Sequence, residues 1–114
     1  MMRIYISGPI TNHLDTAYVR FSYAEIQIKS LGHKPVNPFS IAAYLPDDFS
    51  HSEFMRVDMV LMELCDGVYF MDGWQESEGC RIERARAEAW GLAIFDKISE
   101  MADRRETDGK STNT

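Results

Sequence analysis

Short apolar segments rich in β-branched and aromatic residues alternate along this chain with longer segments in which apolar residues recur at helical spacing. The strand-like segments are residues 3–7, 33–36, 67–71 and 92–95. The helical patterns between them cover residues 14–31, 52–65 and 78–90. Strands that alternate with helices in this way are typical of a parallel sheet with helices on both faces. We therefore predict an α/β fold with a parallel sheet of about four strands.

The remaining segments are predicted from turn and capping residues. Residues 39–51 are expected to form a loop, and Ser52 is the expected N-cap of the second helix. A last short helix is expected over residues 97–104. Residues 105–114 contain no large apolar side chain, so we predict one domain over residues 1–104 and a disordered tail after it.

Composition excludes several classes of function. The 114 residues carry 18 acidic and 12 basic side chains, a formal charge of −6, and no basic block, which argues against nucleic-acid binding. No apolar run approaches the roughly 20 residues that span a membrane, and no signal peptide is recognisable. Two cysteines and three histidines have no metal-ligand spacing, so we expect no metal and a cytoplasmic location.

In a parallel sheet, ligands bind beyond the carboxyl ends of the strands. Three predicted loops meet there, at residues 7–12, 37–40 and 72–77. The first begins with the turn Ser7-Gly8-Pro9-Ile10, whose backbone can approach a ligand closely. This turn lacks the Gly-Lys-Ser/Thr ending of a Walker loop, and GxGxxG is absent, so neither common nucleotide-cofactor motif is present.

Asp58 is the first candidate for chemistry. The second predicted helix has an apolar stripe, and Asp58 lies only about 40° from Phe54 within it. An ionised carboxylate there costs several kcal/mol unless it is paired or hydrogen-bonded. The structural alternative is a carboxylate that accepts backbone N–H groups of a neighbouring loop or pairs with an arginine.

Glu83 is the second candidate, because it falls in the row that Cys80, Ala87 and Trp90 form on the third predicted helix. The alternative is a surface glutamate paired with Arg84 or Arg86. Two acids on the apolar faces of different helices favour a catalytic pair, one ionised and one protonated. Such a pair suits cleavage at an anomeric carbon.

Three further residues have both a structural and a functional interpretation. Ser77 suits the N-cap of the third helix, although the same helix terminus can hold a phosphate. Tyr5 belongs either to the core or to a hydrogen bond with a catalytic acid. Trp74 is either a stacking platform for a base or a cover over the core.

Together these residues resemble the nucleoside 2-deoxyribosyltransferase superfamily, in particular its small bacterial and phage branch, which is related to the 2′-deoxynucleoside 5′-phosphate N-hydrolases. The resemblance extends over about residues 3–95 and is carried by the segment 5–10, by Asp58 with Cys65-Asp66, and by Asp72-Gly73-Trp74 through Ser77, Gly79 and Glu83. It implies a three-layer Rossmann-like (flavodoxin-like) fold, a homo-oligomer and no cofactor. It also implies that the chain breaks or transfers the N-glycosidic bond of a nucleoside or nucleotide.

The same resemblance implies roles for individual residues. Glu83 matches the nucleophile that attacks C1′, Asp58 matches the acid that assists departure of the base, and Tyr5 matches a residue that positions the nucleophile. Ser77 stands where the N-hydrolases have a phosphate-binding serine and the transferases usually have an aspartate, which favours a 5′-phosphorylated substrate. The expected substrate-binding residues are Ser7, Gly8, Pro9, Ile10, Asp72, Gly73, Trp74, Ser77 and Gly79.

We therefore predict an N-glycosidase or deoxyribosyltransferase that acts on a small nucleoside or nucleotide without nucleic-acid or membrane partners. One alternative is a non-catalytic nucleotide-binding module, or a phage accessory protein, that keeps the pocket. Another is a scaffold domain that uses this architecture only to form oligomers. Release of free base distinguishes the first hypothesis from both alternatives.

Overall fold

The computed structural model describes residues 1–10 and 14–102 of the chain. Four strands and their connecting helices make up this part. In chain order they are β1 (Arg3–Ser7), α1 (Leu14–Ser30), β2 (Lys34–Val36), α2 (Pro38–Ala42), α3 (His51–Glu63), β3 (Gly67–Phe70), the 3₁₀ helix η1 (Trp74–Glu76), α4 (Glu78–Ala89) and β4 (Ala93–Phe95). Residues 98–102 are also helical. Within the described ranges, no helix is long and apolar enough to cross a membrane.

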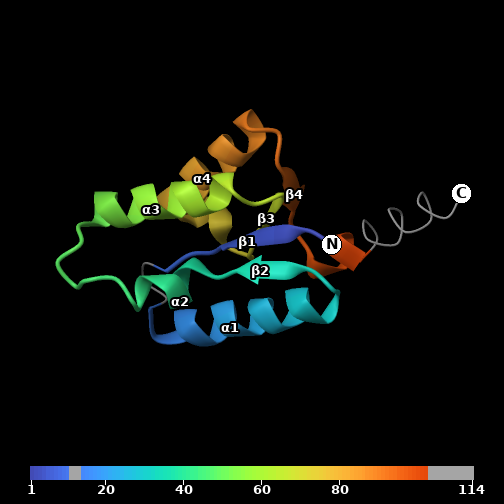
Figure 1. Ribbon diagram of the computed structural model, residues 1–114, viewed down its shortest axis with the longest axis horizontal. Coiled ribbons are helices and arrows are strands. Elements are labelled where there is room, and N and C mark those ends of the chain that lie inside the picture. Colours follow the sequence, from blue (N-terminus) through green and yellow to red (C-terminus); the bar gives the residue numbers. More distant parts are fainter. Residues whose placement is uncertain (11–13, 103–114) are drawn as a thin grey trace, which may run out of the picture.

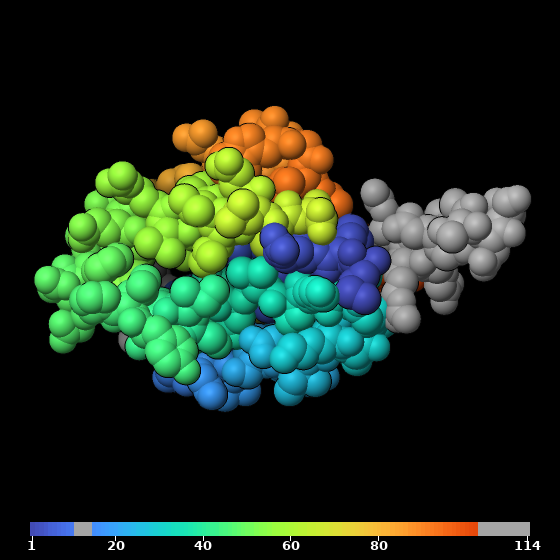
Figure 2. Space-filling view, in the orientation of Figure 1, coloured from blue at the N-terminus to red at the C-terminus, as the bar shows by residue number. Residues whose placement is uncertain are grey.

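The strands form one parallel sheet in the order β2-β1-β3-β4. Tyr5 in the central strand β1 is aligned with Val36 of β2 and Val68 of β3. In Figure 1, α1 and α2 lie on one face of the sheet, and α3 and α4 lie on the other. The space-filling view in Figure 2 has the same layers, with the blue residues of the first strand between them. The predicted three-layer α/β fold is confirmed.

The core is divided between the two faces of the sheet because alternate residues of a strand point to opposite sides. Ile4 and Ile6 pack with the buried face of α1, whereas Tyr5 packs with residues of α3, β3 and α4. Ser7 follows Tyr5 at the same two-residue spacing, so its side chain points toward α4 as well. This alternation carries two hydroxyl groups to the α4 side at the carboxyl end of β1.

Two predictions about the segment before α3 are wrong. The loop expected over residues 39–51 contains α2, which starts with Pro38 after Asn37. The Asn37 side chain accepts hydrogen bonds from the backbone N–H groups of Phe39 and Ser40, and these caps stabilise a helix of only five residues. The N-cap of α3 is Ser50, not Ser52, because Ser50 and Glu53 form a complete capping box.

Two other segments also differ from the sequence prediction. The loop expected over residues 72–77 contains η1, which follows a left-handed Gly73 (φ 89°). A residue with a side chain is strained at this φ, so the backbone conformation alone explains why glycine occupies position 73. The last helix, predicted for residues 97–104, is observed over 98–102, and its expected end lies outside the described residues, as does the predicted tail.

Strand order reverses beside β1, which positions the functional site. The chain passes from β1 to β2 on one side and then crosses to β3 on the other side of β1. Helices on opposite faces therefore diverge at the carboxyl ends of β1 and β3, where parallel α/β sheets bind ligands.

Candidate active site

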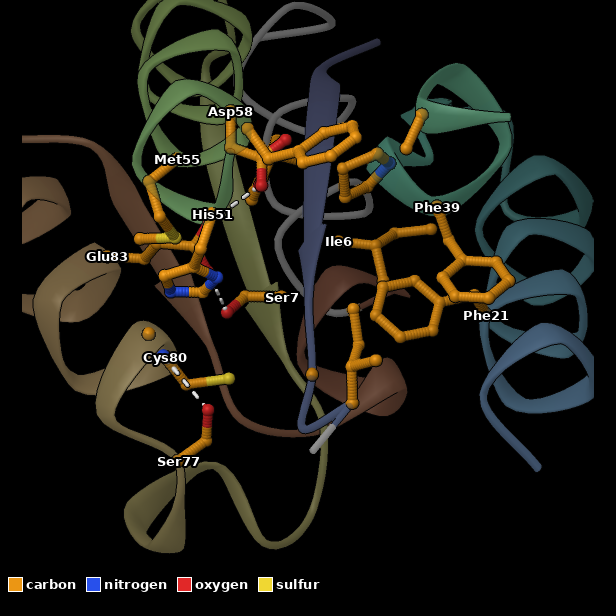
Figure 3. A pocket seen from close by; sticks show the side chains of 17 residues that line it. Ile6, Ser7, Phe21, Phe39, His51, Met55, Asp58, Ser77, Cys80 and Glu83 are labelled. Atoms are coloured by element: carbon orange, nitrogen blue, oxygen red, sulfur yellow. Dashed lines mark hydrogen bonds between the residues drawn. The ribbon is translucent and has the colours of Figure 1, made fainter. Parts of the chain in front are cut away.

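A cavity of about 460 Å³ lies at the carboxyl end of β1. Residues of β1, α1, α2, α3 and α4 line it, together with Gly8, Ile10 and Ser77. In Figure 3, Glu83, Ser7 and Asp58 lie on one side of the β1 ribbon, and Phe21 and Phe39 lie on the other. The volume of the cavity is in the range of binding sites for small molecules.

Glu83 is held in this cavity by two hydroxyl groups of β1. Its side chain comes from α4, and the residue is 6% exposed. The Tyr5 hydroxyl donates to Oε2 at 2.6 Å and the Ser7 hydroxyl donates to Oε1 at 2.7 Å, as Figure 3 shows for Ser7. Both carboxyl oxygens therefore have a fixed orientation.

The pKa of Glu83 is raised because burial disfavours its charged form, and the hydrogen bonds from Ser7 and Tyr5 oppose this effect. Burial also raises the pKa of Tyr5 well above its usual value, and the negative charge of Glu83 adds to the shift. Tyr5 consequently stays a neutral hydrogen-bond donor. Among the described residues, no ion pair joins Glu83 to Arg84 or Arg86, the alternative considered for it, and Arg84 pairs with Asp96 and Glu88.

Asp58 reaches the same cavity from α3. Burial, followed by the charge of Glu83, raises its pKa to about 7. Within the described part of the chain, no ion pair includes Asp58. The surroundings of the two acids therefore differ: two hydrogen bonds favour the ionised form of Glu83 and oppose the effect of its burial, whereas burial and the charge of Glu83 raise the pKa of Asp58 to about 7.

Ser77 has its predicted capping role and also lines the cavity. Its Oγ accepts a hydrogen bond from the Cys80 backbone N–H at 3.3 Å, at the start of α4. Gly79 lines the cavity beside it. A Cβ added at Gly79 would lie 3.8 Å from the Met55 sulfur, which is an ordinary van der Waals distance, so the backbone of α4 lies close to α3 at this point.

Four predicted binding residues are not among the described residues that line the cavity. These are Pro9, Asp72, Gly73 and Trp74. Trp74 packs against Phe70, with ring centroids 5.7 Å apart, and the Arg84 guanidinium lies 4.3 Å from its ring centroid. The indole thus covers the core beside β3, which is the structural alternative considered for it.

With this geometry in place, comparisons with known proteins identify the family. A family model described as a domain of unknown function (DUF4406) matches residues 2–96. The chain belongs to this family. No curated protein sequence matches this DUF4406 chain.

A solved structure is similar in fold to this DUF4406 protein. It is the 2-deoxyribosyltransferase of the psychrotolerant bacterium Bacillus psychrosaccharolyticus, described as a biocatalyst for the synthesis of antiviral and antitumoral nucleosides. The TM-score is 0.64 at 18% sequence identity, over 81% of this chain and 69% of the other. The shared fold is thus established.

Sequence reasoning missed much of the cavity wall of this DUF4406 protein. Phe21 of α1 and Phe39 of α2 stack with centroids 5.6 Å apart and line the cavity with Ile6. Phe54 and His51 line it from α3. Phe39 lies in the 37–40 segment, which was expected at this edge of the sheet, so the sequence could have indicated that Phe39 lines the cavity. The helical pattern marks Phe21 as buried but does not distinguish a cavity wall from the core.

His51 was assigned no role from the sequence, because the three histidines have no metal-ligand spacing. It is exposed and lines the cavity at the start of α3. Among residues 1–10 and 14–102, no group of three or more His, Cys, Asp or Glu side chains is placed to hold a metal ion. Asp58, Glu83, Tyr5 and Ser7 supply the cavity with acid–base and hydrogen-bonding groups.

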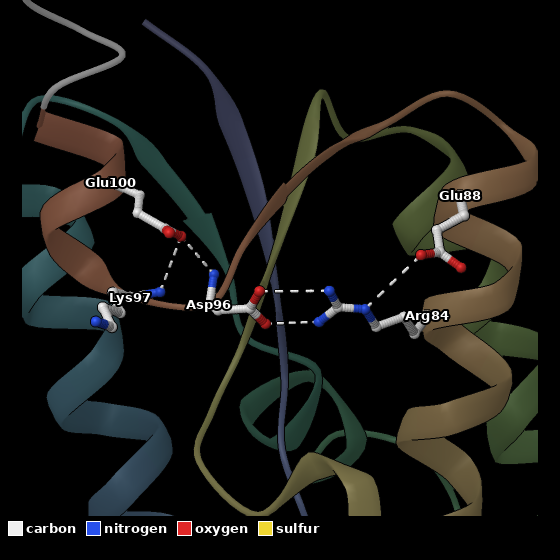
Figure 4. A network of polar contacts seen from close by, with 5 residues as sticks. All are labelled: Arg84, Glu88, Asp96, Lys97 and Glu100. Carbon is white, nitrogen blue, oxygen red and sulfur yellow. Dashed lines mark hydrogen bonds and ion pairs between the residues drawn. The ribbon is translucent and has the colours of Figure 1, made fainter.

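A separate polar network anchors α4, the helix that carries Glu83. Arg84 makes two hydrogen bonds to Asp96, at 2.6 and 3.3 Å, directly after β4 (Figure 4). The Asp96 backbone N–H in turn donates to Glu100. Bidentate arginine–carboxylate pairs have defined geometry, so this network helps to fix the rotation of α4 about its axis.

Proposed function

We propose that this protein breaks or transfers the N-glycosidic bond of a nucleoside or nucleoside 5′-monophosphate, with Glu83 as the nucleophile at C1′. Asp58 is the acid that assists departure of the base. The observation that carries the proposal is the convergence of these acids, from two helices, on one cavity where β1 hydroxyls hold Glu83. The fold shared with a deoxyribosyltransferase supports the same reaction class.

In the first step, a carboxylate oxygen of Glu83 bonds to C1′ while the bond from C1′ to the base nitrogen breaks. The electron pair of the broken bond stays with the base, and Asp58 donates a proton to it. Tyr5 and Ser7 keep the carboxylate aimed at the sugar through hydrogen bonds, which weaken as the carboxylate bonds to C1′ and loses its negative charge.

In the second step, water or another base attacks C1′ and releases Glu83 as a carboxylate. The ionised Asp58 takes the proton that the attacking group loses, which restores the starting state. A pKa of about 7 suits both roles, because the group can give and accept a proton near neutral pH. Water as the acceptor gives hydrolysis, and a second base gives transfer.

The test is release of free base from a panel of nucleosides and nucleoside monophosphates, measured by chromatography. We expect release by the wild type, none by Glu83→Ala, and a strong reduction in Asp58→Asn. Glu63→Gln, an exposed acid of α3 outside the cavity, is the matched control and keeps full activity. Calorimetric binding without any release by the wild type would instead favour a non-catalytic nucleotide-binding module.

We also propose that the protein is a homo-oligomer. The outer face of α1 presents Tyr18, Val19, Tyr23 and Ile26, each between 62% and 66% exposed. Val19, Tyr23 and Ile26 follow one another at helical spacing, so they form a continuous apolar stripe. Light scattering coupled to size-exclusion chromatography tests this, and a monomeric mass at micromolar concentration would contradict it.

A further inference from the structure

We propose that the cavity selects an uncharged nucleoside and disfavours the corresponding 5′-monophosphate. The inference rests on the proposed function and names the substrate class of that site. This selection is the opposite of what the family resemblance at Ser77 implies, which is a 5′-phosphorylated substrate. The distribution of charge and of apolar surface around the cavity carries it.

The ionisable groups inside the cavity are acidic. Asp58 and Glu83 line it, and no lysine or arginine does so among the residues that the structure describes. His51 is the single described histidine of the lining, and it is exposed. A phosphate dianion bound beside these acids is repelled, and the low dielectric of a half-enclosed site strengthens that repulsion.

Two arginines near the cavity are engaged elsewhere. Arg20 of α1 donates to the Pro9 carbonyl oxygen at 2.7 Å, and Arg81 of α4 donates to the Gln75 carbonyl oxygen at 2.8 Å. Neither side chain is part of the cavity lining. A phosphate would have to draw one of them away from these contacts to gain a charged partner.

Much of the remaining wall is apolar. Phe21, Phe39 and Ile6 form the side of the cavity on the α1 face of the sheet, and Phe54 and Met55 line it from α3. Burying a charged phosphate against aromatic and aliphatic groups costs several kcal/mol or more. The flat apolar base of a nucleoside, in contrast, suits these rings.

The segment around Ser77 is also unfavourable for a phosphate. The Ser77 oxygen already accepts the Cys80 N–H, so this N–H of the α4 terminus is used by the chain itself. Glu76 and Glu78 flank Ser77 in the sequence and are exposed. These carboxylates offset the positive end of the helix dipole where an anion would approach.

The effect of charge inside the cavity is visible in its own residues. Burial, followed by the charge of Glu83, raises the pKa of Asp58 to about 7, so a second negative charge in the cavity is disfavoured at neutral pH. A 5′-phosphate would add up to two more. The neutral 5′-hydroxyl of a nucleoside avoids this cost.

The experiment compares a nucleoside with its own monophosphate, for example deoxyadenosine with deoxyadenosine 5′-monophosphate. Wild-type kcat/KM measures selection with both acids in place, and calorimetry on the Glu83→Gln protein measures binding without turnover and without the charge of Glu83. We expect a preference for the nucleoside on the order of tenfold in kcat/KM and a smaller preference in the calorimetry. Asp58→Asn should narrow the binding preference, and the exposed Asp47→Asn should leave it unchanged.

Equal or tighter binding of the monophosphate overturns the inference. Loss of that binding in Arg20→Met would then identify Arg20 as the phosphate partner. If the nucleoside binds preferentially but no base is released by the wild type, the proposed function fails and the selection stands. If neither compound binds, both proposals fail.

Discussion

Replacing Asp58 by asparagine should stabilise the protein above neutral pH while it removes a catalytic group. The pKa of Asp58 is raised from 3.8 to about 7 in the folded chain, mainly by burial. The folded state therefore binds more protons than the unfolded state between these two values. Stability from this group is complete below about pH 4 and is lost as the pH rises to about 7.

The magnitude follows from the shift. About three pKa units at about 1.4 kcal/mol each give an upper limit near 4 kcal/mol for the cost of ionising Asp58 in the fold. Because the side chain is only partly buried, solvent screens part of this, and we expect about 1–3 kcal/mol. Asparagine has nearly the same shape and no charge, so it avoids the cost.

Urea denaturation of the wild type and Asp58→Asn at pH 4 and pH 8.5 measures the difference. The two proteins should have nearly equal free energies of unfolding at pH 4, and the variant should be the more stable at pH 8.5. Asp47→Asn, an exposed acid outside the cavity, should show no such pH dependence relative to the wild type. A variant less stable than the wild type at pH 8.5 would refute the reasoning.

Three further predictions concern the acids and their supports. Release of base should decline above about pH 7 as Asp58 loses its proton. A profile of kcat/KM between pH 5.5 and 9 measures this decline, and a flat profile contradicts the acid role of Asp58. Tyr5→Phe removes the donor to Glu83 Oε2 and should lower kcat about 10- to 100-fold with little change in KM, whereas unchanged kcat in steady-state assays would exclude a positioning role. Arg84→Met breaks the pair with Asp96 and the contact with Trp74, and should lower the free energy of unfolding by about 1–3 kcal/mol in urea; Arg84→Lys should recover only a small part of this loss, and full recovery by lysine would count against bidentate pairing.

Much of the fold could be predicted because the three long helices have enough residues to display the helical repeat of apolar side chains. The helical row through Cys80, Ala87 and Trp90 predicts that Glu83 points inward. The structure finds Cys80, Glu83 and Ala87 buried, whereas Trp90, the C-cap residue of α4, is 37% exposed. The stripe through Phe54 likewise predicts the inward position of Asp58. In both cases, local geometry alone fixes the direction of the side chain.

Features that depend on contacts between distant segments could not be predicted in this way. Helix α2 and η1 are too short for a period to be visible. The stacking of Phe21 on Phe39 joins two helices, and the position of Trp74 depends on Arg84 and Phe70. A sequence pattern indicates that such residues are apolar and partly buried, but their partners decide whether they line a cavity or cover the core.

Peptide mapping by mass spectrometry, on enzyme quenched during turnover, tests the central claim most directly. The account predicts a sugar ester on the peptide that contains Glu83, together with its absence from the Glu83→Gln protein. A sugar ester on a different residue, or undiminished release of base by Glu83→Gln, would contradict it.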